Sequence, residues 1–159
     1  MHGNLLDSID IDIIETLQKA GRTKRGELSD QVGLSIPTIS ERLLKLEQHG
    51  IIKGYHAVLD PRKLGLEVTA YIFLISDSSA HYQDVINLAV NREEILECHA
   101  ITGEGSHLLK VRVANMSRLE KLLLEIQSWP GVKNTTTDIV LSTAKETSDL
   151  SLTHLRENS

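Results

Sequence analysis

The stretch Ser35–Gly50, which reads S-I-P-T-I-S-E-R-L-L-K-L-E-Q-H-G, decides how the first third of the chain folds. It predicts one helix of about four turns. Ser35 can cap its start, Pro37 falls in the first turn where a missing N–H costs little, and Gly50 can end it. Apolar residues recur at spacings of three and four and so predict one buried stripe: Ile36, Ile39, Leu43 and Leu46.

The opposite face of this helix is polar and begins at the N-terminal end: Thr38, Glu41, Arg42, Lys45 and Gln48. A helix that docks in the major groove of DNA needs this layout, because its first two turns meet base edges and phosphates. Taken alone, the same face also fits an ordinary surface helix in which Glu41 and Lys45 pair four residues apart. The flanking sequence decides between these two interpretations.

Two further helices are predicted before this one. Residues 6–20 place apolar side chains on one helical face, with Asp7 or Ser8 as the cap. Residues 24–32 predict a second, shorter helix that Gly33 closes. A turn of about three or four residues containing Gly, placed between two helices after a supporting helix, is the helix-turn-helix arrangement.

Basic residues lie where the second helix begins. Lys24 and Arg25 can grip phosphate groups there, and Arg22 lies just before them. The short turn makes the last two helices cross steeply, which pushes the polar face of the 35–50 helix outward. We therefore predict a DNA-binding set in which the first three members position the backbone and the others lie on or cap that helix: Arg22, Lys24, Arg25, Ser35, Thr38, Ser40, Glu41, Arg42 and Lys45.

The rest of the chain predicts a second domain of α+β class. Residues 51–59 alternate loosely and predict a small wing strand, and D-P-R-K-L-G at 60–65 predicts a linker. We expect a helix-turn-helix domain at 1–53, the wing strand and linker at 54–65, and a second domain at 66–159. Elements are then predicted at 66–76 (strand), 79–90 (helix), 95–102 and 107–113 (strands), 117–129 (helix) and 132–141 (strand).

This order, βαββαβ, predicts a ferredoxin-like sandwich with both helices on one face of an antiparallel sheet. The pair Ser117 and Glu120 predicts a capping box for the second helix, and Pro130 with Gly131 stops it. The first strand is apolar on both faces, so we expect its open face to meet a partner subunit in a dimer.

Composition limits the classes of protein that fit. Hydrophobic residues make up 40% of the 159, enough for a packed core. No apolar run approaches the roughly 20 residues that span a bilayer, and the N-terminus lacks the pattern of a secretory signal. We expect a cytoplasmic protein without membrane association, and the single cysteine fits that reducing compartment. The net charge of −5 argues weakly against nucleic-acid binding, although acids and bases nearly balance within residues 20–60.

No metal, cofactor or catalytic site is predicted. Cys98 and His99 are adjacent on a strand and so point to opposite faces, which prevents them from sharing an ion. We expect Cys98 to be a small core residue and His99 to lie on the open face of the sheet. The G-x-G at Gly103 lies between two strands and not before a helix, so it is no phosphate cradle.

Motifs that carry a family resemblance run along nearly the whole chain. In the first third they are L-D-S-I-D-I-D-I-I-E-T-L-Q from Leu6, G-R from Gly21, E-L-S from Glu27, V-G-L-S from Val32 and R-L-x-x-L-E-x-x-G-I-I-x-G-Y from Arg42. Later they are E-C-H from Glu97, T-G from Thr102, L-L-K from Leu108 and P-G-V from Pro130 with the threonines that follow. Together they resemble the Lrp/AsnC family, the leucine-responsive and asparagine-responsive regulators of bacteria and archaea.

This resemblance implies a winged helix-turn-helix followed by the sandwich, in a sequence-specific regulator that binds double-stranded DNA through the helix matching Ser35–Gly50. It also implies homodimers that assemble into higher oligomers, an octamer above all, with an amino-acid effector at contacts between dimers. Carried over to this chain, the effector loop faces a threonine strand of a neighbour, and the implied residues are Gly103, Glu104, Gly105, Ser106, His107, Thr135, Thr136 and Thr137.

The effector loop departs from the family pattern. The family commonly has Gly-Asp-aromatic-Asp-Tyr before the leucines, whereas this chain has Gly-Glu-Gly-Ser-His, without the second acid and both aromatic residues. A plain hairpin turn at G-E-G is the alternative interpretation.

Two other functions fit the architecture. Sirohaem decarboxylases share a related two-domain organisation, but the polar face with Thr38, Arg42 and Lys45 favours a regulator over an enzyme. A small-molecule sensor that does not bind DNA is the other alternative, which the net acidity leaves open.

Overall fold

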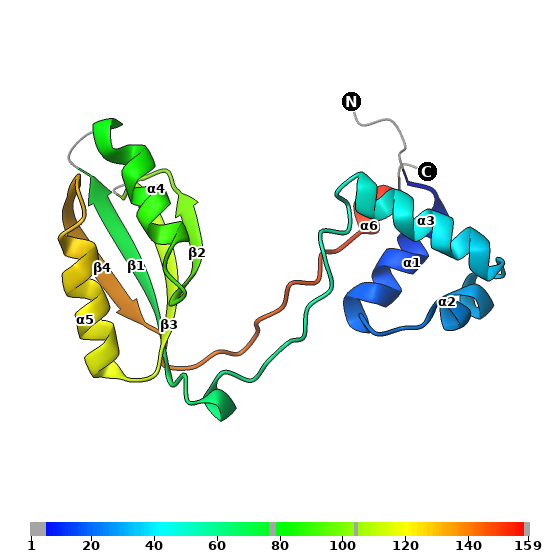
Figure 1. Ribbon diagram of the computed structural model, residues 1–159, viewed down its shortest axis with the longest axis horizontal. Helices are drawn as coiled ribbons and strands as arrows, with labels where there is room; N and C mark the ends of the chain where they lie inside the picture. Colours follow the sequence, from blue (N-terminus) through cyan, green and yellow to red (C-terminus); the bar gives the residue numbers. More distant parts are fainter. Residues whose placement is uncertain (1–5, 77–78, 104, 158–159) are drawn as a thin grey trace. The chain divides into compact units, whose positions relative to one another are not determined.

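The computed structural model describes residues 6–76, 79–103 and 105–157, and the chain divides into two compact units (Figure 1). Residues 59–144 form one unit. The described residues up to Val58 form the other, together with the tail that starts at Lys145. The sequence predicts one second domain at 66–159, whereas this division groups the tail with the first helix, to which Leu150 and Arg156 bond.

The N-terminal unit is built on α1 (Ser8–Lys19), α2 (Arg25–Val32) and α3 (Ile36–Gln48), as the sequence predicts. Asp7 caps α1, and its carboxylate and that of Asp10 accept reciprocal backbone hydrogen bonds.

Glycine shapes the turn before α3. Gly33 ends α2 with φ +71°, a left-handed conformation that glycine adopts without strain. Ser35 caps α3. These local preferences set the helix-turn-helix connection.

The core of this unit is small and apolar: Ile13, Leu28, Ile39, Leu43 and Leu46 are buried together. The predicted stripe of α3 is thus confirmed at three of its four positions. Ile36 is 51% exposed, because it is the first residue of α3 and its side chain points back beyond the helices that pack on the later turns.

The predicted wing strand at 51–59 does not form. A strand needs a neighbour for its backbone hydrogen bonds, and the described part of this unit contains no other strand. The segment instead begins with two N–H groups, of Ile51 and Ile52, that donate to the Leu46 carbonyl. Further along, the Tyr55 hydroxyl donates to Glu47 on α3 at 3.0 Å.

The second unit confirms the ferredoxin-like prediction. Its strands β1 (Val68–Ser76), β2 (Ile95–Ala100), β3 (His107–Val113) and β4 (Val132–Ile139) form one antiparallel sheet in the order β2-β3-β1-β4. Helices α4 (Tyr82–Val90) and α5 (Met116–Gln127) pack on one face of it (Figure 1). Shorter helical turns are η1 (Arg62–Leu64), η2 (Ser79–His81) and, in the tail, α6 (Thr153–Arg156).

Alternation along β1 gives the sheet two different faces. Ala70, Ile72 and Leu74 are fully buried against the helices, while Tyr71 and Phe73 lie on the open face and are half-buried. The sheet therefore keeps an apolar surface that its own helices do not cover.

Helix α5 begins one residue earlier than expected. Its cap is Asn115, whose side chain accepts from the Arg118 N–H at 3.0 Å, so the predicted capping box of Ser117 and Glu120 is wrong. Asn is at least as good a cap as Ser, and here it precedes the first turn.

Candidate nucleic-acid interface and ligand hollow

The N-terminal end of α3 presents hydroxyl groups at the surface. Ser35 is exposed, and its Oγ lies 2.7 Å from Thr38 Oγ1. The Ser40 hydroxyl is occupied within its own helix, because its Oγ donates to the Ile36 carbonyl at 3.0 Å. Of these predicted contact residues, Ser35 and Thr38 present their hydroxyls where a ligand can reach them.

Glu41 and Lys45 form the ion pair that an ordinary surface helix would have. Lys45 Nζ lies 2.9 Å from Glu41 Oε1, and both side chains are more than half exposed. The Lys45 hydrogen bond lowers the pKa of Glu41. An exposed pair of this kind is weak, so it leaves Lys45 available to a phosphate and Glu41 available to a donor on a base edge.

Arg42 has a different environment from the rest of the polar face. Its guanidinium lies 2.7 Å from Asp10 Oδ1 and 2.8 Å from Asp7 Oδ2, and only 24% of its side chain is exposed. It therefore joins the middle of α3 to the first turn of α1 and does not project into solvent as Lys45 does.

Electrostatics stabilise this bridge, which we call the Arg42 clamp (Asp7, Asp10 and Arg42). The hydrogen bond to Asp10 raises the pKa of Arg42 despite its partial burial. Partial burial alone would raise the pKa of Asp7, but the hydrogen bonds from the Asp10 N–H and from Arg42 lower it. The sequence does not predict the clamp, because local spacing assigns Asp7 only as a possible cap of the first helix.

A groove of about 380 Å³ runs beside the clamp. Thr38, Glu41 and Lys45 line it on α3, and His49 also lines it. The predicted backbone-positioning residues Arg22, Lys24 and Arg25 are all exposed on the surface of the same unit. This unit thus presents basic side chains and a polar helix N-terminus together.

The open face of the sheet carries a hollow of about 280 Å³ that brings part of the predicted effector site together. It is lined by Phe73, Ile75, Ile101, Thr102, Gly105 and Thr136. Thr136 pairs with Phe73 across β4 and β1. The apolar members of this lining were not predicted; the register of β1 with β4 places Phe73 opposite Thr136, and Ile101 follows β2.

Gly105 lets the hairpin approach β1 closely. A Cβ at this position would lie 3.3 Å from the Leu74 carbonyl oxygen and 3.4 Å from Ile101. Ser106 secures the approach, because its N–H donates to the same carbonyl at 2.8 Å. Gly103 has φ +112°, and Glu104 lies outside the described residues.

His107 is fully buried and faces the helices, on the opposite side of the sheet from the hollow. Its ring centroid lies 4.8 Å from that of Tyr82 on α4. Ser106 Oγ donates to the Leu74 carbonyl, so it accepts from His107 Nδ1 at 3.1 Å, and Nε2 is left buried without a hydrogen-bond partner. Burial lowers the pKa of this imidazole.

The threonine strand divides between the two faces in the same way. Thr135 accepts a hydrogen bond from Gln127 of α5, and Thr137 lines a groove beside that helix. Only Thr136 of the three lines the hollow, since neighbouring residues on a strand alternate.

Cys98 and His99 lie on opposite faces of β2, as the sequence predicts. Cys98 packs against the core, where burial raises the pKa of its thiol, and His99 pairs with Leu108 on the open face. Among the described residues, no group of His, Cys, Asp and Glu side chains is arranged to hold a metal ion. In that same part of the chain, no helix has the length and apolar character needed to cross a membrane.

Comparisons with known proteins agree with this geometry. The family model for the winged helix-turn-helix DNA-binding domain matches residues 6–53, and that for the Lrp/AsnC ligand binding domain matches residues 68–150. The chain belongs to the Lrp/AsnC family. It therefore carries the DNA-binding and ligand-binding domains of a transcriptional regulator.

Individual relatives cover nearly the whole chain. The HTH-type transcriptional regulator FL11 of Pyrococcus abyssi is 41% identical over 91% of this chain and 95% of its own. The leucine-responsive regulatory protein of Escherichia coli is 40% identical over 93% and 92%. Both relatives are named as regulators.

Solved structures show the same fold. A transcriptional regulator from Neisseria meningitidis in complex with L-Met is 34% identical, with a TM-score of 0.88 over 94% of this chain and 99% of that one. AsnC of Escherichia coli is 32% identical, with a TM-score of 0.86 over 91% and 98%.

The Arg42 clamp predicts coupled stabilities. Arg42→Gln and Asp10→Asn should each lower the free energy of unfolding by about 1–2 kcal/mol, because each leaves a partly buried charge without its partner. The double variant should lose less than the sum, with a coupling of about 1 kcal/mol, measured by urea unfolding. Lys45→Gln, which removes an exposed pair, is the control and should change stability by less than about 0.5 kcal/mol. Additive losses in the double variant would contradict the clamp.

Burial of His107 predicts a pH-dependent stability. The folded chain holds the neutral imidazole, whereas the unfolded chain takes up a proton near pH 6.5, so stability should be retained above about pH 6.5 and fall below it. Thermal unfolding between pH 7.5 and 5 should show this decrease in the wild type and a smaller one in His107→Gln. His56→Gln, at an exposed histidine, is the control. If the melting temperatures of wild type and His107→Gln fall equally with pH, His107 is not the source of the pH dependence.

Proposed function

We propose that this protein regulates transcription as a homodimer that binds double-stranded DNA through α3 and the start of α2, and that an amino acid held at the open-face hollow alters its assembly. The observation that carries the DNA-binding part is the exposed polar face of α3, which begins at the helix N-terminus and continues along the groove to Lys45. A recognition helix contacts bases and phosphates with this part of its surface.

The DNA contacts divide into two kinds. Thr38, Glu41 and Lys45 face the major groove, while Arg22, Lys24 and Arg25 contact phosphates. Ser35 caps α3 at the same end. Ser40 stands at the margin of the surface, because its hydroxyl is engaged by its own helix.

Arg42 acts on DNA binding through the clamp. It fixes α3 against α1, so we assign it as a positioning residue in place of a direct reader of bases. Reading DNA would require Arg42 to leave two carboxylates at 2.7 and 2.8 Å, whereas Lys45 has one exposed partner.

The hollow has the chemistry for a small amino acid. Its volume of about 280 Å³ is close to the lower end of the usual range for small-molecule sites, about 300–1,000 Å³. Phe73, Ile75 and Ile101 supply apolar surface for a side chain, and the hydroxyls of Thr102 and Thr136 supply hydrogen bonds. The L-Met in the Neisseria regulator and the leucine in the name of the Escherichia coli regulator support this class of ligand.

Assembly connects the two parts of the proposal. The apolar open face, with Tyr71 and Phe73, is suited to a second subunit, and dimers then associate into a higher oligomer such as an octamer. A ligand whose site is completed only when two dimers meet shifts this equilibrium. We retain Gly103, Glu104, Gly105, Ser106 and Thr136 as the proposed effector-binding residues. His107, Thr135 and Thr137 are left out because they face the helix side of the sheet. The unpaired Cys98 fits action in the cytoplasm.

DNA binding is tested with the full-length protein and a fragment of its own promoter. Lys24→Gln should weaken binding to all sequences alike and reduce the salt slope of log K by about one unit, because one phosphate contact is lost. Lys133→Gln, which removes the same charge from the sheet unit, should leave the slope unchanged. Footprints should show half-sites about one helical turn, or a multiple of it, apart. Absence of wild-type binding at low salt would contradict this proposal and favour a sensor that does not bind DNA.

Effector binding is tested by analytical ultracentrifugation with each of the common amino acids in turn. One amino acid should shift the oligomer distribution of the wild type. Thr136→Val should raise the concentration needed by about fivefold to tenfold, because one hydrogen bond in the hollow is lost. Thr135→Val makes the same change on the helix side of the strand and should leave the response unchanged. Equal responses of the two variants would exclude the hollow.

A further inference from the structure

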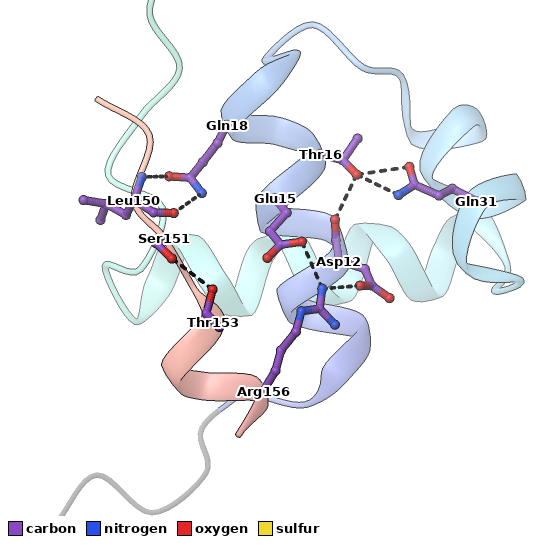
Figure 2. Close-up of polar contacts among 9 residues, drawn as sticks. All are labelled: Asp12, Glu15, Thr16, Gln18, Gln31, Leu150, Ser151, Thr153 and Arg156. Atoms are coloured by element: carbon purple, nitrogen blue, oxygen red, sulfur yellow. Dashed lines mark hydrogen bonds and ion pairs between the residues drawn. The ribbon is translucent and has the colours of Figure 1, made fainter. Parts of the chain in front are cut away.

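The C-terminal tail docks on α1 of the DNA-binding unit (Figure 2). The Gln18 side chain forms hydrogen bonds with both the N–H and the carbonyl of Leu150. Its Oε1 accepts from the Leu150 N–H at 2.6 Å, and its Nε2 donates to the Leu150 carbonyl at 3.1 Å. Arg156, at the end of α6, donates to Asp12 at 2.6 Å and to Glu15 at 3.0 Å.

One face of α1 receives the tail. Ile11, Glu15 and Gln18 follow each other at helical spacings of four and three, so they lie on the same side of the helix. Ile11 is only 1% exposed, although it lies on the side that carries the polar contacts to the tail. Leu152 and Leu155 of the tail are half-buried. The docked segment thus has two half-buried leucines between its polar anchors at Leu150 and Arg156.

The docked tail directly follows the last strand of the ligand-binding sheet. Residues 140–149 lead directly from β4, which carries Thr136 of the hollow, to the anchor at Leu150. The ligand-binding family model ends at residue 150, so α6 and Arg156 follow the matched part of the chain. The other connection between the units runs through residues 53–67.

We propose that residues 145–157 form a strap that couples the ligand-binding sheet to the DNA-binding unit, because it anchors the chain that follows β4 to α1. With the tail docked, two connections join the units in place of one, and this second connection restricts how α1 can move relative to the sheet. Its regulatory meaning, a path from the hollow on β4 to the unit that carries α3, rests on the proposed function. The mechanical coupling itself does not.

The strength of the contacts suits a reversible strap. Arg156, Asp12 and Glu15 have side chains that are 37–43% exposed, and ion pairs at such positions are individually weak and sensitive to salt. The pair between Gln18 and Leu150 is neutral and does not depend on salt. A docked state of this kind is released by small changes in free energy, which is the condition for a ligand to shift its population.

Hydrogen exchange of the full-length protein tests the docking without DNA or ligand. Arg156→Glu places a carboxylate against Asp12 and Glu15, so exchange of the amides at 150–156 should become about fivefold faster. Combining it with Glu15→Arg restores an opposite pair and should recover most of the protection. Lys145→Glu makes the same change in charge in the same tail and should have no effect. Exchange that is equal in wild type and Arg156→Glu overturns the docking.

The coupling is tested by spin-label distances between Gln48 on α3 and Glu120 on α5. Both positions are replaced by cysteine in a Cys98→Ser background, and labelled chains are mixed with excess unlabelled chains so that each assembly holds one pair. Arg156→Glu should broaden the distance distribution, while Lys145→Glu should not. An unchanged width in Arg156→Glu overturns the strap. A failure of the proposed function would appear separately, as wild-type protein that binds no DNA.

Discussion

The N-terminal unit depends on how α3 is held, because this one helix must be fixed on one face and free on the other. Burial of Ile39, Leu43 and Leu46 against α1 and α2 supplies most of the fixation, since apolar burial contributes about 25 cal/mol per Å². That burial is non-directional, however, and apolar packing alone tolerates rotation. The Arg42 clamp adds direction, because two carboxylates on the first turn of α1 define where the middle of α3 must lie.

In the sheet unit, the alternation of side chains along each strand separates a buried face from an open face. Every second residue of β1 packs under α4 and α5, and the residues between them form an apolar open face. The same period decides which members of a continuous sequence motif share a site. Thr135 and Thr136 are neighbours on β4, yet Thr135 accepts a hydrogen bond from Gln127 of α5 while Thr136 lines the hollow. One strand therefore supplies both a structural core and a ligand surface, and a motif read as one unit divides between them.

Sequence reasoning predicts what local patterns encode. Helical spacing, caps and turn glycines predict α1, α2 and α3, and the order of elements predicts the ferredoxin-like sheet. Partners distant in sequence are not encoded locally. Asp10 with Arg42 and Gln18 with Leu150 are brought together only by tertiary packing, and so are the apolar residues that line the hollow. The wing strand is the converse error, because an alternating pattern predicts a strand but supplies no neighbour for it.

These features assign a different task to each side of α1. Its apolar side packs in the core through Ile13, its first turn holds Arg42, and a third side takes the tail at Glu15 and Gln18. The helix that contacts no base in the proposed complex is thus the one that holds both the recognition helix and the docked tail. A shift of α1 by the tail would move the carboxylates that fix Arg42, and α3 would have to follow or lose the clamp. Because the clamp is more buried than the tail contacts, the tail is the part of this arrangement that yields first.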